Sequence, residues 1–126
     1  MKKYSLLIIL VFIFSCKESV DKKKDIVYLS PDCGCCHDWI SHMESNDFVL
    51  EKNMDANMYD IKTNAGLPID LASCHTALIK GYFIEGHVPA KDVKRLLKET
   101  PDGIIGLTVP GMPAGINVPG MEVNNE

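Results

Sequence analysis

The stretch "IVYLSPDCGCCHDWISHM", residues 26–43, decides the fold prediction. Its first four residues are β-branched, aromatic or aliphatic, and the turn-forming "SPD" follows, which predicts a short strand that leads into the cysteines. After the cysteines, apolar residues recur at helical spacing from Cys36 to Met43. Three cysteines, Cys33, Cys35 and Cys36, are therefore expected between the end of a strand and the start of a helix.

Beyond this stretch, the chain continues to alternate between strand and helix patterns. Residues 48–54 predict a second strand, and residues 56–66 predict a helix that ends at Gly66. Pro68 then interrupts regular structure, so we expect Cys74 on an irregular segment. Residues 76–86 have the pattern of a strand with Gly81 as a kink or turn, and residues 89–99 predict a further helix.

The order of these elements, in a chain of 126 residues, predicts an α/β fold. We expect a thioredoxin-like single domain over residues 26–126. Glycine and proline recur from Pro101 onward, and "VPGM" occurs twice, at residues 109–112 and 118–121. Two copies this short do not make a structural repeat. We therefore expect a Gly/Pro/Met-rich C-terminal arm that presents two methionines at turns.

The first 25 residues have the pattern of an export signal and a tether. Lys2 and Lys3 precede an apolar stretch at residues 6–14, and Ser15 stands directly before Cys16. The stretch is shorter than the about 20 apolar residues that a membrane-spanning helix needs. "IFSC" is similar to the lipobox of bacterial lipoproteins, which predicts a signal peptide over residues 1–15 and lipidation of Cys16; a plain secretory signal is the alternative. Residues 16–25 are charged and predict a flexible tether.

Export sets the expected compartment and partners. We expect a lipid-anchored protein of the bacterial cell envelope that faces the periplasm, where disulfides are chemically allowed. Removing Lys2 and Lys3 lowers the 13 basic residues to 11 against 17 acidic ones, so the net charge moves from -4 to -6. An acidic chain argues against nucleic acid as a partner.

Cys33 and Cys36 form a C-x-x-C between a strand and a helix, which is the thioredoxin-type redox arrangement. A helix N-terminus stabilises thiolates, so we expect low thiol pKa values there. Cys35 complicates this interpretation, because a third thiol inside the pair competes for the disulfide. A thiol-disulfide oxidoreductase using Cys33 and Cys36 is therefore the alternative hypothesis.

A soft metal site uses all of these thiols. The three thiolates of the loop, joined by Cys74 if the fold brings it alongside, favour Cu(I) or zinc over hard cations. Structural zinc sites usually draw their ligands as two separated pairs. Crowded, bridging thiolates suit Cu(I) and allow more than one copper ion, as a multinuclear thiolate cluster.

Histidines and methionines supply weaker candidates. His75 follows Cys74 directly and is the best second type of donor, whereas His87 equally suits a capping or hydrogen-bonding role. We expect His37 and His42 on the exposed side of the first helix. Met112 and Met121 lie in the matching "VPGM" turns and offer thioether donors, although methionine is more often a gap-filler.

Disulfide pairing offers a third, purely structural interpretation of the cysteines. Four cysteines in an exported domain can form two disulfides. Within the loop only Cys33–Cys36 closes easily, because closures between nearer cysteines are strained. Cys35–Cys74 would then complete the framework.

Several motifs together identify a family resemblance: "SPDCGCCHDW", "GLPIDLASCHTALIKGYFIEGHVPAKDVKRLL", "GLTVPGMPAG" and "PGME". With them, the chain resembles the CopG-like family of small exported bacterial copper-resistance proteins, formerly a family of unknown function. The resemblance implies a thioredoxin-like fold and copper handling in the periplasm, including a suggested interconversion of Cu(I) and Cu(II). It carries over Cys33, Cys35, Cys36 and Cys74 as copper-binding thiols.

We therefore expect a metal-binding protein rather than an enzyme, with copper or thiol oxidoreductase activity as the alternative. It would sequester or transfer Cu(I) and contribute to copper resistance. The expected partners are copper ions and periplasmic copper carriers or efflux components, with the membrane contacted only through the lipid anchor.

Overall fold

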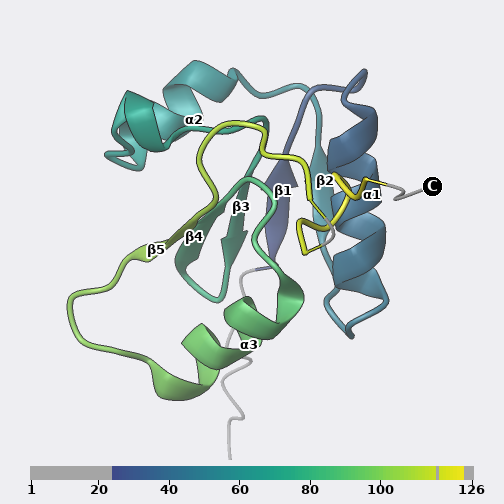
Figure 1. Cartoon of the computed structure of the whole chain (residues 1–126). Helices are drawn as coiled ribbons and strands as arrows, with labels where there is room; N and C mark the ends of the chain where they lie inside the picture. Colours follow the sequence, from purple (N-terminus) through teal and green to yellow (C-terminus); the bar gives the residue numbers. More distant parts are fainter. Residues whose placement is uncertain (1–23, 116, 124–126) are drawn as a thin grey trace, which may run out of the picture.

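The computed structural model describes residues 24–115 and 117–123 (Figure 1). Within them the chain forms β1 (Ile26–Tyr28), α1 (Gly34–Glu44), β2 (Glu51–Asn53), α2 (Met58–Asn64), a 3-10 helix (Ile69–Leu71), β3 (Thr76–Ile79), β4 (Tyr82–Glu85), α3 (Ala90–Glu99) and β5 (Gly106–Thr108). The predicted signal peptide, Cys16 and most of the tether lie outside the described residues. No helix of the described part is long and apolar enough to cross a membrane.

The five strands form one mixed sheet in the order β2-β1-β3-β4-β5. β1 pairs in parallel with β2 and antiparallel with β3, β3 pairs antiparallel with β4, and β4 pairs in parallel with β5. The expected α/β single domain is thus confirmed at the level of a mixed sheet with helices.

Two segments differ in detail from the prediction. Residues 76–86 form a hairpin of two strands, because Lys80 and Gly81 take positive φ angles of 49° and 90° at the turn. The C-terminal arm is not all loop, since it contributes β5. Gly106 makes this pairing possible, because a Cβ there would lie 1.9 Å from the Phe83 carbonyl oxygen.

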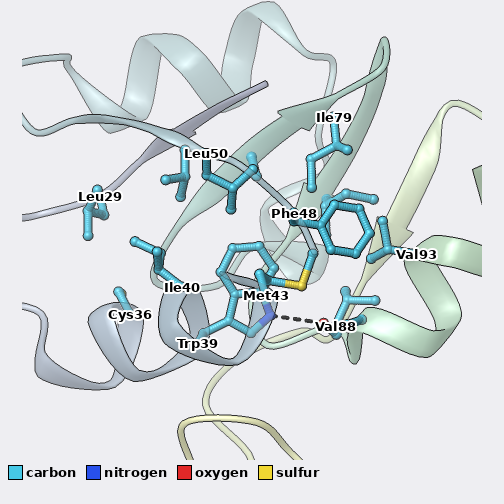
Figure 2. Packing of buried hydrophobic residues seen from close by; sticks show 14 of the residues in the cluster. Leu29, Cys36, Trp39, Ile40, Met43, Phe48, Leu50, Ile79, Val88 and Val93 are labelled. Atoms are coloured by element: carbon cyan, nitrogen blue, oxygen red, sulfur yellow. Dashed lines mark hydrogen bonds between the residues drawn. The ribbon is translucent and has the colours of Figure 1, made fainter. Parts of the chain in front are cut away.

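The hydrophobic core lies between the sheet and the helices α1 and α3 (Figure 2). Trp39, Ile40 and Met43 of α1 are fully buried, as the helical spacing predicted. Trp39 also donates its indole N–H to the Val88 carbonyl at 2.8 Å. This bond fixes the first turns of α1 against the segment between β4 and α3.

α2 lies against the opposite face of the sheet. Side chains alternate along a strand, so Thr76 and Glu85, which are paired across β3 and β4, face away from the core residues Ala77 and Ile84. Lys62 of α2 donates to both Thr76 and Glu85. None of the residues of α2 is buried, and Lys62 gives this helix a polar contact with the sheet.

Candidate metal centre

The cysteine loop connects the end of β1 to the first turn of α1. Cys33 is the N-cap residue, and its carbonyl accepts from the Cys36 and His37 N–H groups at 3.2 and 3.3 Å. Cys33 and Cys36 form a disulfide, with Cys36 fully buried beneath it. Cys35 lies between them as a half-buried free thiol, and its sulfur is 3.6 Å from that of Cys33.

Cys74 reaches the same place from the irregular segment before β3. The sulfurs of all four candidate cysteines lie within 4.8 Å of one another: Cys33, Cys35, Cys36 and Cys74. Cys74 is also a free thiol. The two-disulfide framework considered above is therefore not formed, because the structure contains the Cys33–Cys36 bridge alone among these four residues.

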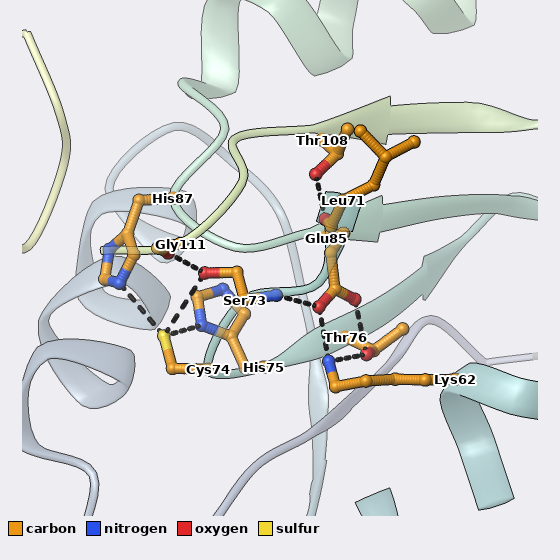
Figure 3. Close-up of polar contacts among 10 residues, drawn as sticks. All are labelled: Lys62, Leu71, Ser73, Cys74, His75, Thr76, Glu85, His87, Thr108 and Gly111. Carbon is orange, nitrogen blue, oxygen red and sulfur yellow. Dashed lines mark hydrogen bonds and ion pairs between the residues drawn. The ribbon is translucent and has the colours of Figure 1, made fainter. Parts of the chain in front are cut away.

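Two histidines place nitrogen donors beside Cys74 (Figure 3). The Cys74 sulfur lies 3.3 Å from His75 Nδ1 and 3.2 Å from His87 Nε2. The three donor atoms lie within 4.8 Å of one another, and both imidazoles are buried. Cys74 thus belongs to two groups of donors, one of sulfur atoms and one of mixed sulfur and nitrogen.

The His75 ring is held as a neutral imidazole. Burial, followed by the nearby His87 and Lys62, lowers its pKa from 6.5 to about 3. Its ring packs against that of Trp39 at 4.4 Å between centroids, tilted by 42°, and within the described residues its Nε2 has no hydrogen-bond partner. A neutral imidazole keeps a lone pair for a metal ion at ordinary pH.

The second "VPGM" turn sets the tautomer of His87. Its Nδ1 donates to the Pro119 carbonyl at 2.7 Å, which leaves the Nε2 lone pair facing Cys74. This is the usual way in which proteins orient a ligating histidine. Gly120 packs the turn onto α1, because a Cβ there would lie 2.6 Å from the Cys35 carbonyl oxygen. His87 was only a weak candidate in the sequence, and nothing local marked its partner 32 residues away.

The expectation of low thiol pKa values is wrong for Cys35. Burial, and then the charge and hydrogen bonding of Cys74, raise the pKa of Cys35. The backbone N–H groups of Cys35 and Cys36 lower it, but they do not outweigh these effects. Crowding of sulfur on sulfur therefore opposes the effect of the helix N-terminus.

Comparison with known proteins places this geometry in a family. Two solved structures of copper resistance protein CopG, Form 2 and Form 1, share 42% sequence identity with the chain and cover 82% of it, with TM-scores of 0.74 and 0.73. The matches span 80% and 79% of those chains. The chain belongs to the CopG family of copper resistance proteins. The resemblance identified from the motifs is thereby confirmed.

Two further comparisons match shorter parts of the chain. Residues 71–121 match the family model described as a protein of unknown function, DUF411. A phosphoenolpyruvate synthase of Pyrococcus furiosus is 39% identical over 62 residues, which are 48% of this chain and 8% of that enzyme. The chain thus spans only a small part of that relative.

The remaining candidates of this CopG family member, the two methionines, differ in exposure and in the segments that their turns contact. Met112 is 57% exposed and follows Gly111, which is bridged to Ser73. Met121 is half-buried and follows Gly120, directly beside the cysteine loop. The second turn therefore has the closer connection to the donors.

The two other histidines belong to neither donor group. His37 is half-buried, and its Nε2 contacts the Pro31 carbonyl at 3.3 Å. The expected exposed position is wrong for His42, which is half-buried because its Nε2 accepts from the Ala90 N–H at 3.1 Å. His42 thereby caps the first turn of α3.

Membership in the CopG family and the Cys/His donor groups together support a copper-related role. Thiolates prefer soft ions such as Cu(I), and imidazoles accept copper in either oxidation state. The site combines both kinds of donor around one shared sulfur, that of Cys74.

Proposed function

We propose that the protein binds Cu(I) through the thiolates of Cys33, Cys35, Cys36 and Cys74, and that it sequesters or transfers the metal and so contributes to copper resistance. The observation that carries this proposal is the gathering of four sulfur atoms within 4.8 Å of one another. Four bridging thiolates in such a space suit a small multinuclear cluster. His75, His87 and, less directly, Met112 and Met121 are additional donors at its edge.

The Cys33–Cys36 disulfide has to open before the full site exists. The bridge takes up two electrons and two protons from a dithiol reductant, which becomes a disulfide, and yields the Cys33 and Cys36 thiols. Copper then displaces the thiol protons as it binds. A raised Cys35 pKa makes that displacement harder at low pH.

The proposed setting is the bacterial cell envelope, facing the periplasm. A signal peptide over residues 1–15 and a lipid on Cys16 would hold the domain at a membrane through residues 16–25. The proposed fold is thioredoxin-like, supported by the core strand order β2-β1-β3-β4 with a parallel first pair. Periplasmic copper carriers or efflux components are the proposed partners.

Thiol-disulfide exchange is the second candidate, favoured by the disulfide at the start of α1. There, a reduced Cys33 thiolate attacks a substrate disulfide and releases one substrate thiolate. Cys36 then attacks the mixed disulfide, releases the second thiolate and regenerates the Cys33–Cys36 bridge. Cys35, with its sulfur 3.6 Å from that of Cys33, competes in this reaction.

Substitution of Cys35 separates the two functions. Under the copper proposal, Cys35→Ser lowers the number of Cu(I) ions bound per chain, measured by anaerobic titration with a colorimetric Cu(I) chelator. Under the alternative, Cys35→Ser leaves disulfide reductase activity at or above the wild-type rate, whereas Cys33→Ser abolishes it. Unchanged copper binding by Cys35→Ser would contradict the copper proposal.

A further inference from the structure

Glu85, at the end of β4, is a buried carboxylate outside both donor groups. Its side chain is 1% exposed, and it lies two residues before His87. Oε1 accepts from the Lys62 ammonium and, at 2.6 Å, from the Ser73 N–H, while Oε2 accepts from the Thr76 hydroxyl at 2.6 Å. Both carboxylate oxygens of Glu85 therefore accept hydrogen bonds, and the negative charge of the carboxylate strengthens these bonds.

The Ser73 N–H is the important partner, because Ser73 directly precedes Cys74. The segment that carries Cys74 belongs to none of the five strands, so its backbone is held by other contacts. Gly111 N donates to the Ala72 carbonyl at 2.9 Å, and Thr108 Oγ1 donates to the Leu71 carbonyl at 2.7 Å. At Ser73 itself, the hydroxyl donates to the Gly111 carbonyl and the N–H donates to Glu85 (Figure 3).

The residue that follows Glu85 fixes the other side of Cys74. Gly86 N donates to the His75 carbonyl at 3.0 Å. A Cβ at Gly86 would lie 2.5 Å from Ser73 Oγ, so the two segments are in close contact. Glu85 and Gly86 therefore bond to the backbone of the residues immediately before and immediately after Cys74.

Lys62 is the counter-ion of the buried Glu85 carboxylate. A buried carboxylate without a counter-ion is strongly unfavourable, and an unpaired negative charge beside thiolates would also oppose their ionisation. The Lys62 ammonium cancels that charge and donates to Thr76 Oγ1 at 2.9 Å. Lys62 comes from α2, which contributes no donor atom to either group.

We propose that Glu85 and Lys62 are positioning residues of the metal centre: their buried ion pair holds the Ser73 backbone so that Cys74 lies beside His87 and opposite the cysteine loop. This inference rests on the proposed copper-binding function. It extends the centre to α2 and assigns a purpose to a buried ion pair that touches no donor atom.

The chain provides a matched control at the other end of the sheet. Asp25 is 8% exposed, and its carboxylate accepts from the Lys80 ammonium at 3.0 Å and from the Lys80 N–H at 2.9 Å. It precedes β1, whereas the cysteine loop follows β1. Asp25 therefore shares the chemistry of Glu85 without its connection to Cys74.

The test compares Glu85→Ala with Asp25→Ala in the full-length, reduced protein under anaerobic conditions. We expect Glu85→Ala to weaken Cu(I) affinity by about 10–100-fold, the usual effect of losing an outer-shell partner. Asp25→Ala should lower the urea midpoint similarly while its affinity stays within about threefold of wild type. Equal losses of affinity in both variants, or none in Glu85→Ala, would overturn the inference.

A second variant covers the case in which Glu85→Ala does not fold. Lys62→Met/Glu85→Leu removes both charges, a change that proteins often tolerate in stability, but it leaves the Ser73 N–H without its acceptor. We expect a urea midpoint near that of wild type together with weakened Cu(I) affinity. Wild-type affinity in this folded variant would contradict the positioning role.

A metal-free measurement separates failure of this inference from failure of the copper proposal. With Cys33–Cys36 oxidised, the alkylation rates of Cys35 and Cys74 are read from their peptides by mass spectrometry. We expect Lys62→Met/Glu85→Leu to change the Cys74 rate at least about threefold relative to Cys35. If wild type bound no Cu(I), the copper proposal would fail, and an unchanged Cys74 rate would refute the positioning role.

Discussion

The two halves of the candidate metal centre are built in different ways. The cysteine loop is local, because Cys33, Cys35 and Cys36 lie within four positions at the start of one helix. The other half is assembled from distant segments: Cys74 and His75 before β3, His87 after β4, and the Pro119 carbonyl from the C-terminal arm. The first half holds a disulfide, whereas the second holds a free thiol and two imidazoles.

The donors of the first half become available through reduction, whereas those of the second half are brought together by folding. Two of the three loop sulfurs become available only after reduction. The donors around Cys74 are present in either redox state, provided that the surrounding hydrogen bonds hold. Cys74 is the one member of both groups and so joins the two halves.

The largest effect is expected from removing this shared sulfur. Cys74→Ala takes a donor from both groups at once, so we expect Cu(I) affinity to fall by about 100-fold, close to 2.8 kcal/mol. Competition with a chromophoric Cu(I) chelator measures it. His37→Ala is the control, because His37 contacts the Pro31 carbonyl and belongs to neither group. If Cys74→Ala lost no more Cu(I) affinity than His37→Ala, Cys74 would not be the donor that the two groups share.

His75 should make the stability of the metal-free protein depend on pH. The pKa of His75 is about 3 in the folded protein and near 6.5 when unfolded, so the unfolded state binds more protons between these values. Stability is therefore full above about pH 6.5 and is lost as the pH falls toward 3. From pH 7 to 4, we expect metal-free wild type to lose about 3 kcal/mol more than His75→Phe in urea unfolding. Parallel curves for the two proteins would refute this.

His87→Ala tests the mixed sulfur and nitrogen half of the centre, in which the sequence made His87 only a weak candidate ligand. It removes the Nε2 donor and leaves the cysteine loop unchanged, so we expect Cu(I) affinity to fall about tenfold, or 1.4 kcal/mol. The copper-thiolate absorption in the ultraviolet should persist, because the loop sulfurs remain. Loss of that absorption would mean that His87 supports the whole site rather than one side of it.

The smallest effect is expected from the two methionines. Met121 follows the turn that contacts the Cys35 carbonyl, whereas Met112 is 57% exposed. We expect Met121→Leu to weaken Cu(I) affinity about threefold and Met112→Leu to stay within about twofold, since a thioether is a weak ligand. The same chelator competition measures both. If Met112→Leu weakened Cu(I) affinity more than Met121→Leu, the first "VPGM" turn and not the second would supply the thioether ligand.

The parts of the fold that the sequence predicted are the local ones. The helical spacing around Trp39 and the residue types before Pro31 placed β1 and α1 correctly, because each pattern lies within one element. β5 was missed because it has only three residues in a segment rich in glycine and proline, and because Gly106 allows a close approach to Phe83 that only the folded chain reveals.

The same limit applies to the site. The four cysteines could be proposed from residue type and spacing alone, since few chemistries need three thiols in one loop. The contacts of His87 with Pro119, and of Glu85 with Lys62, join segments 32 and 23 residues apart. No local pattern specifies such pairs, although the alternation along β4 would have placed Glu85 on the face opposite to Ile84.

Reduction of the Cys33–Cys36 disulfide is expected to turn a partial site into a complete Cu(I) site. The most direct test is an anaerobic Cu(I) titration of the same protein with Cys33–Cys36 oxidised and reduced, with free thiols counted in both samples. We predict that the reduced form gains two thiols, binds more Cu(I) ions per chain and binds them more tightly. Equal copper binding by the two forms, or none by the reduced form, would contradict this role of the disulfide.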